Sequence, residues 1–154
     1  MKFSGEITVA APRDAVFARL QDMRFFASCI EGVSGLVERE DRKYDAMFST
    51  KVAYMNFSFK VTAELTEMTA PERITAKVEG TPMGLVGRLT ATTATHLVDS
   101  GQGTTIRYEI DATLTGKLGS IGQPVMKSKA KEMEKQFAKN LSAAFAPAAA
   151  GGTA

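Results

Sequence analysis

The C-terminal stretch 123–145, QPVMKSKAKEMEKQFAKNLSAAF, decides how this chain folds. Apolar side chains recur in it every three or four residues, which places them on one face of a helix. They are Met126, Ala130, Met133, Phe137, Leu141 and Ala144. The other side carries the lysines Lys127, Lys131, Lys135 and Lys139. At 1.5 Å per residue this helix is roughly 34 Å long, the longest element that the sequence predicts. Pro124 is expected near its start, or at a kink if the helix begins around Lys117.

The chain before this helix reads almost wholly as strands. Apolar and polar residues alternate over 44–52, 57–65, 74–80, 89–97 and 106–114, the period of half-buried strands. Short connections, such as the turn at 99–103, make neighbouring strands antiparallel. With strands at 3–9 and near 33–39, the pattern predicts about seven.

Two short helices are expected after the first strand. Pro12 suits the first position of a helix that carries Val16, Phe17 and Leu20. A second helical turn is expected over residues 24–30.

A sheet with one apolar face must cover that face, and only the C-terminal helix is long enough to do so. The sequence therefore predicts an α+β helix-grip fold. A seven-stranded curved antiparallel sheet wraps around the long helix, and the two short helices close one end. Residues 1–146 form a single domain in this prediction, and residues 147–154 form a flexible tail of small residues.

Composition narrows the class of protein. The chain has 154 residues, 44% of them hydrophobic, enough to bury a core, and a net charge of +2, which gives no indication of nucleic acid binding. The single cysteine and single histidine do not make a usual metal site, so no metal is expected. There is no signal-peptide pattern and no apolar run long enough to span a membrane, so we expect a cytoplasmic location.

Strand parity and helix spacing direct one set of side chains inward, where they would line a cavity for an apolar ligand. Small inward residues, such as Ala46, Ala76 and Ala91, favour unfilled space beneath the helix. The expected lining is Phe25, Phe26, Cys29, Phe48, Phe57, Phe59, Met83, Leu85, Leu89, Ile106, Tyr108, Ile110, Met126, Met133 and Phe137. The same residues would make a packed core, so composition leaves cavity and core open. Met83 and Leu85 fit either an ordinary hairpin corner or a hydrophobic lid.

Several stretches carry a family resemblance. They are MKFSGE (1–6), APRDAVF (11–17), CIEGV (29–33), residues 104–111, GKLGSIG (116–122), and the pairs Ala130-Lys131 and Gln136-Phe137. With the order of elements, they resemble the CoxG family of carbon monoxide dehydrogenase subunits. That family belongs to the START/polyketide cyclase-like (SRPBCC) superfamily, which has a START/Bet v1-like fold. It usually has proline where this chain has Glu31.

The resemblance implies a non-catalytic accessory protein of a molybdenum hydroxylase of the carbon monoxide dehydrogenase type. Such a protein would aid the enzyme's assembly, its membrane association, or electron transfer to quinone. It implies no cofactor beyond a bound quinone or lipid. The resemblance also implies that longer members end in a membrane-anchoring segment. This chain departs from them, because its tail stops after roughly ten small residues, so it is expected to contact a membrane only peripherally, at its inner face.

Two other functions stay open. A polyketide cyclase or dehydratase-like enzyme would need an acid or base in the cavity. His96 is expected on the outer sheet face, which leaves Tyr108 and Tyr44 as the obvious inward candidates. An assembly chaperone would use the lysine side of the helix (Lys127, Lys131, Lys135 and Lys139) to meet a partner protein or an anionic membrane. Ordinary solvation is the simpler explanation of these lysines.

Overall fold

All seven strands belong to one antiparallel sheet in the computed structural model, which describes residues 1–101 and 103–145. Their order across the sheet is β1-β7-β6-β5-β4-β3-β2. The strands are β1 (Lys2–Val9), β2 (Val33–Glu40), β3 (Lys43–Val52), β4 (Met55–Thr69), β5 (Arg73–Pro82), β6 (Gly87–Asp99) and β7 (Thr104–Gly116). Strands β2 to β7 follow one another as hairpins. Because β1 pairs with β7, the first and the last strand of the chain lie next to each other at one edge of the sheet.

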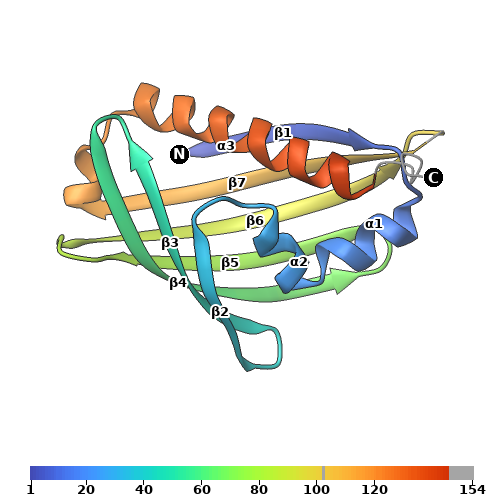
Figure 1. Cartoon of the computed structure of the whole chain (residues 1–154), viewed down its shortest axis with the longest axis horizontal. Helices are drawn as coiled ribbons and strands as arrows, with labels where there is room; N and C mark the ends of the chain where they lie inside the picture. The colour runs from blue at the N-terminus through green and yellow to red at the C-terminus, as the bar shows by residue number, and fades with distance from the viewer. Residues whose placement is uncertain (102, 146–154) are drawn as a thin grey trace.

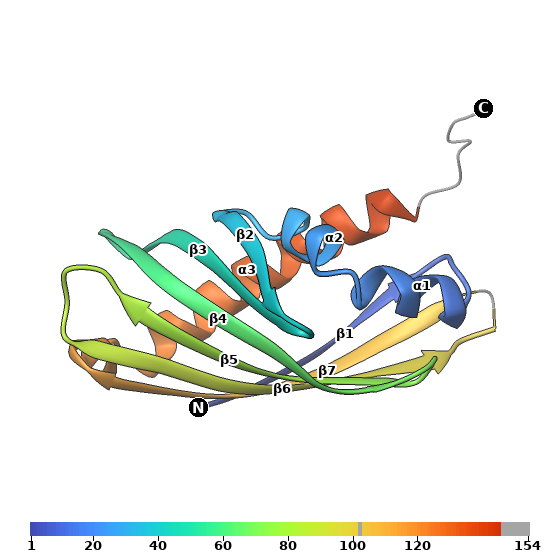
Figure 2. The same ribbon diagram turned by 90° about the horizontal axis from the view of Figure 1, so that it is seen from below.

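Four helical segments complete the fold: α1 (Arg13–Leu20), α2 (Met23–Ser28), the 3-10 turn η1 (Lys117–Ser120) and α3 (Gln123–Ala144). The sheet curves, and α3 crosses its concave side while α1 and α2 sit towards one end (Figures 1 and 2). The predicted helix-grip fold is confirmed. The predicted tail, residues 147–154, lies outside the described residues.

Local sequence explains where the helices begin. Pro12 precedes α1 in an extended conformation and so stands one position before its first turn. The Asp22 side chain accepts hydrogen bonds from the backbone N–H groups of Arg24 and Phe25 and caps α2. Pro124 lies in the first turn of α3, where its missing N–H removes no intrahelical bond.

Gly116 has a packing role at the turn between β7 and η1. Its φ is +64°, and a Cβ there would lie 2.5 Å from the Val86 carbonyl oxygen and 2.6 Å from the Gly87 Cα. Only glycine allows this close approach of two backbones. The sequence pattern alone did not reveal this contact.

The buried core divides into two clusters. Cluster A lies beneath α1, α2 and the C-terminal half of α3, and cluster B lies towards the β3–β4 and β5–β6 turns and η1. The buried members of cluster A are Ile7, Val9, Val16, Phe17, Leu20, Cys29, Leu65, Ile74, Leu97, Ile106 and Leu141. Those of cluster B are Val52, Phe57, Phe59 and Leu118.

Truncation of Leu141 tests how firmly α3 is held. Its side chain is 0% exposed and joins α3 to cluster A. Leu141→Ala should lower the free energy of unfolding by about 2–5 kcal/mol, because it removes buried methyl groups and leaves a cavity. Urea denaturation measures the change. The exposed neighbour Lys139→Ala is the control and should change it by less than about 0.5 kcal/mol. Equal losses in the two variants would contradict this packing.

Candidate ligand-binding cavity

Some side chains that parity directs inward belong to neither cluster, and each of them is only half-buried. We take this half-buried set as the candidate ligand site and call it the central groove. Its members are Ala46, Ala63, Val78, Ala91, Thr93 and Ile110 from the sheet, and Met126 and Met133 from α3.

The strand register places short side chains next to one another in this region. Ala46 pairs with Val61, Ala63 with Val78, and Ala91 with both Val78 and Ala112. Short side chains therefore stand side by side across several strands, so this part of the sheet carries little side-chain volume to fill the interior. Met126 and Met133 of α3 are half-buried and add adaptable apolar side chains.

The predicted lining residues fall into four groups. Cluster A and its partly buried neighbours take Phe25, Phe26, Cys29, Ile106, Tyr108 and Phe137. Cluster B takes Phe48, Phe57, Phe59, Leu85 and Leu89. The central groove takes Ile110, Met126 and Met133. Met83 differs from the other predicted lining residues. It follows the last residue of β5, in the β5–β6 turn, and is 52% exposed, so it does not point inward with them.

Two aromatic contacts lie within the flanking clusters. Phe26 of α2 lies 5.3 Å from Phe137 of α3, measured between ring centroids. At the other end, the Phe48 and Phe59 rings of β3 and β4 stack at 6.3 Å. The first pair joins α2 to α3, and the second joins the neighbouring strands β3 and β4.

One polar pair stands under α3, and the sequence interpretation missed its acidic member. The Tyr108 hydroxyl of β7 donates a hydrogen bond to Glu134 Oε2, and both side chains are half-buried. Gly5 of β1 makes room for them, since a Cβ there would collide with both groups. Gly5 pairs with Tyr108 in the strand register. The inward-facing set therefore contains a carboxylate beside a phenol.

Burial also affects two other titratable side chains. Desolvation by burial raises the pKa of the Cys29 thiol, and a hydrogen bond with Ser28 opposes this in part. Desolvation first, and then the nearby carboxylates of Glu38 and Asp41, raise the pKa of Tyr44. Both groups therefore stay protonated near neutral pH, so neither supplies a ready nucleophile or base.

The state of Cys29 gives a direct test. Because its pKa is raised, the reactive thiolate forms only at higher pH than in a free cysteine, and the side chain is 3% exposed. Alkylation by iodoacetamide at pH 8 should be at least about tenfold slower in the folded protein than in urea. Mass spectrometry over time measures both rates. Equal rates would show that Cys29 is accessible.

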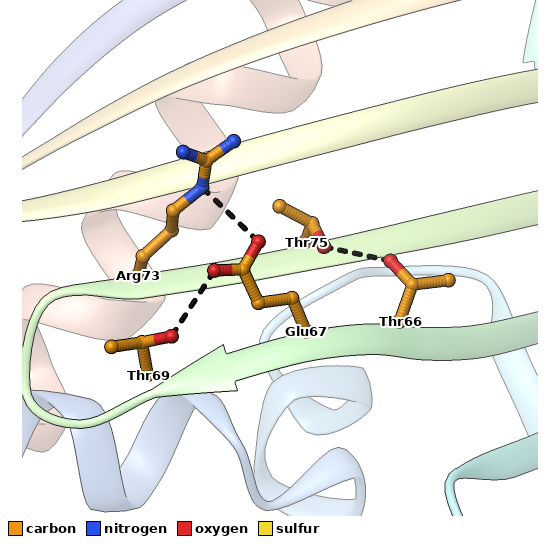
Figure 3. Close-up of polar contacts among 5 residues, drawn as sticks. All are labelled: Thr66, Glu67, Thr69, Arg73 and Thr75. Atoms are coloured by element: carbon orange, nitrogen blue, oxygen red, sulfur yellow. Dashed lines mark hydrogen bonds and ion pairs between the residues drawn. The ribbon is translucent and has the colours of Figure 1, made fainter.

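The outer face of the sheet is polar. A broad hollow of about 740 Å³ there is lined by side chains of both charges and by threonines, among them Lys2, Arg73, Thr75 and Asp111. At its margin Arg73 pairs with Glu67, which also accepts from the Thr69 hydroxyl (Figure 3).

Next to this network, the Thr66 and Thr75 hydroxyls are 2.7 Å apart. His96 opposes Arg73 and Arg107 in the register and so lies on this outer face, as expected. The hollow does not offer the apolar walls that the predicted ligand needs.

The lysines of α3 lie as expected. Lys127, Lys131, Lys135 and Lys139 are all exposed. Lys129 differs from them, because its side chain is only 14% exposed and forms an ion pair of 2.9 Å with Glu132. Within the described residues, no group of three or more possible metal ligands comes together, and no helix is long and apolar enough to cross a membrane.

A curved antiparallel sheet closed around a C-terminal helix defines the START/Bet v1-like class of folds. Within it, this chain belongs to the CoxG family of carbon monoxide dehydrogenase subunits, which it matches over residues 5–146. No curated protein matches the chain.

Solved structures show the same fold. A conserved protein from Geobacillus kaustophilus superposes with a TM-score of 0.87 at 23% identity, covering 96% of this chain and 97% of the other. A START superfamily protein from Mycobacterium smegmatis gives 0.69 at 13% identity, covering 94% and 96%. The protein CV1439 from Chromobacterium violaceum gives 0.68 at 16% identity, covering 96% and 99%.

Proposed function

We propose that this protein binds an apolar, quinone- or lipid-like molecule in the central groove and serves a molybdenum hydroxylase of the carbon monoxide dehydrogenase type as an accessory protein. The observation that carries the proposal is a half-buried set of short side chains on the sheet and two methionines on α3, all of which belong to neither packed cluster. Membership of the CoxG family supports the choice of partner enzyme.

The Tyr108–Glu134 pair gives the ligand a polar end. Because the Tyr108 proton is already donated to Glu134, the remaining carboxylate and phenol lone pairs can only accept hydrogen bonds. A ligand that carries a hydroxyl or N–H group would satisfy them. Between the two redox forms of a quinone, the hydroquinone has hydroxyl donors and the quinone has only acceptors, so the pair favours the reduced form.

Ligand identification tests the proposal directly. Native mass spectrometry of the purified protein, followed by organic extraction, should recover a hydrophobic molecule in about one-to-one ratio. Added menaquinone or ubiquinone should displace it or fill the empty protein. If no hydrophobic molecule is recovered and neither quinone gives a binding signal, the carrier function is lost.

A docking role predicts a second, separable property. The exposed lysines of α3 form a basic strip that an acidic surface of the partner enzyme would attract. Replacing Lys127, Lys131, Lys135 and Lys139 by glutamate should abolish co-purification with the molybdoenzyme and leave ligand content unchanged. If the variant still co-purifies with the enzyme, these lysines do not form the docking surface and serve only as the solvated side of the helix.

The second candidate function is a polyketide cyclase or dehydratase-like enzyme, and the observation that favours it is Glu134. A half-buried carboxylate hydrogen-bonded to a phenol is the kind of group that removes a proton next to a carbonyl. Turnover of small polyketide-like substrates, lost in Glu134→Gln, would establish it. Binding without turnover would leave the pair as a ligand anchor.

A further inference from the structure

The large apolar side chains that the fold leaves exposed gather at one end. Tyr54 is 95% exposed and Val86 is 79% exposed, and Met55, Met83 and Val125 are also exposed. These residues lie in the β3–β4 turn and the first residue of β4, in the β5–β6 turn, and in the first turn of α3, all at the end of the molecule opposite α1 (Figures 1 and 2). Elsewhere among the described residues, only Val37 and Val98 are large, apolar and exposed. We call this end the tip.

Hydrogen bonds hold the parts of the tip together. The Met83 N–H donates to the Ser58 carbonyl at 2.8 Å, joining the β5–β6 turn to β4. The Lys117 N–H donates to the Val86 carbonyl at 2.8 Å, joining the same turn to η1. Beneath them, cluster B packs Leu118 and Leu85 against Val52. These contacts fix the segments relative to one another, so their exposed side chains can contact one surface together.

The charge of the tip has a single sign. The segments 51–58, 81–88 and 116–127 contain Lys51, Arg88, Lys117 and Lys127 and have no aspartate or glutamate. Arg88 pairs with Glu79, which lies just outside these segments, at 2.6 Å. Exposed apolar residues rimmed by cations match an anionic bilayer, whose headgroups attract the lysines while the apolar side chains enter the boundary with the acyl chains.

We propose that the tip docks on anionic lipid membranes, through Tyr54, Met83 and Val86 in the interface and Lys51 and Lys117 at the headgroups. The contact that we propose is interfacial, because these side chains stand on two turns and on η1 and the ends of the neighbouring strands. The tip shares Lys127 with the lysine strip of α3 but otherwise differs from it, because Lys131, Lys135 and Lys139 have no comparable group of exposed apolar side chains beside them. Docking at the tip brings cluster B, which closes that end of the groove, next to the lipid.

Vesicle co-sedimentation tests the proposal with the full chain. Vesicles of phosphatidylcholine with about 30% phosphatidylglycerol should bind the protein at least tenfold more tightly than pure phosphatidylcholine vesicles. Tyr54→Ser/Met83→Ser/Val86→Ser and, separately, Lys51→Glu/Lys117→Glu should each weaken binding at least tenfold. All five positions are exposed, so both variants should keep the wild-type unfolding curve.

Two matched controls locate the contact. Val37→Ser/Val98→Ser removes exposed apolar residues elsewhere, and Lys131→Glu/Lys135→Glu reverses charge on the α3 strip. Both should bind within about twofold of wild type. No binding of the wild type to the anionic vesicles, or tip variants that bind as well as wild type, would overturn the proposal. So would a larger loss in the α3 control than in the tip variants, which would move the contact to the helix.

The proposal extends the proposed function by naming where the ligand would be collected. Vesicle binding by the protein needs no ligand in the groove, and ligand recovery needs no vesicle. A negative vesicle experiment would therefore leave ligand binding in place, and a negative ligand analysis would leave membrane docking in place.

Discussion

The variant Ala91→Phe should fold as the wild type does and bind apolar ligands about 100-fold more weakly. Ala91 stands in the middle of the central groove, half-buried, with Val78 and Ala112 opposite it in the register. A phenyl ring added here enters the space that the ligand would take. In an already packed core the same ring would lower the free energy of unfolding by about 1–3 kcal/mol. The experiment therefore separates a cavity from a filled core.

Fluorescence of the apolar probe N-phenyl-1-naphthylamine measures binding, and urea denaturation measures stability. The matched control is Thr92→Phe, which places the same ring on the next residue of β6 but on the outer face. It should bind the probe as the wild type does. If Ala91→Phe loses stability and the wild type binds no probe, the interior is a packed core and the groove holds no ligand.

The fold was predictable because the two-residue period of the strands and the period of about 3.6 residues in the long helix are both clear in the sequence. Strict alternation in β4 and β7 and the three- and four-residue spacing in α3 each depend on many side chains, so a single exception does not change the result. The turn chemistry agreed with them: Pro124 stands in the first turn of α3, which was one of the two expectations for it. Bounds then followed within a few residues.

The interior was less predictable, because parity tells which way a side chain points and not how much space remains around it. Parity assigns the inward residues to one face, but their division into two packed clusters with half-buried residues between them depends on the curvature of the sheet and the position of α3. Met83 shows the same limit. Its place in the alternation gives no indication that the β5–β6 turn carries it past the sheet.

Glu134 was missed although the sequence contained a signal. It lies four residues after Ala130 and three before Phe137, both of which were assigned to the inward face, so helix geometry places it inward too. A face defined only by its apolar residues does not include a charged one, so Glu134 was not among the predicted inward residues. A second signal was Gly5, a residue without a side chain at an inward position of a predicted strand, where a neighbour must come close.

The variant Glu134→Leu should remove the preference of the groove for ligands that carry a hydroxyl. The wild type should bind 2-naphthol about 10–100-fold more tightly than 2-methoxynaphthalene, because a hydrogen bond to a charged group contributes about 1.5–3 kcal/mol and the ether has no proton to donate. In Glu134→Leu the affinity for 2-naphthol should fall to that of the ether, while the affinity for the ether stays or rises. Isothermal titration calorimetry measures both.

The control Glu132→Leu makes the same change on the exposed side of α3, where the side chain is 70% exposed, and should leave both affinities as in the wild type. Tyr108→Phe removes the donor that holds the carboxylate in place, so it should reduce the preference in part. Equal affinity of the wild type for the two compounds would show that the pair does not contact the ligand. A parallel loss of both affinities in Glu134→Leu would instead mean that the carboxylate only holds α3 against β7.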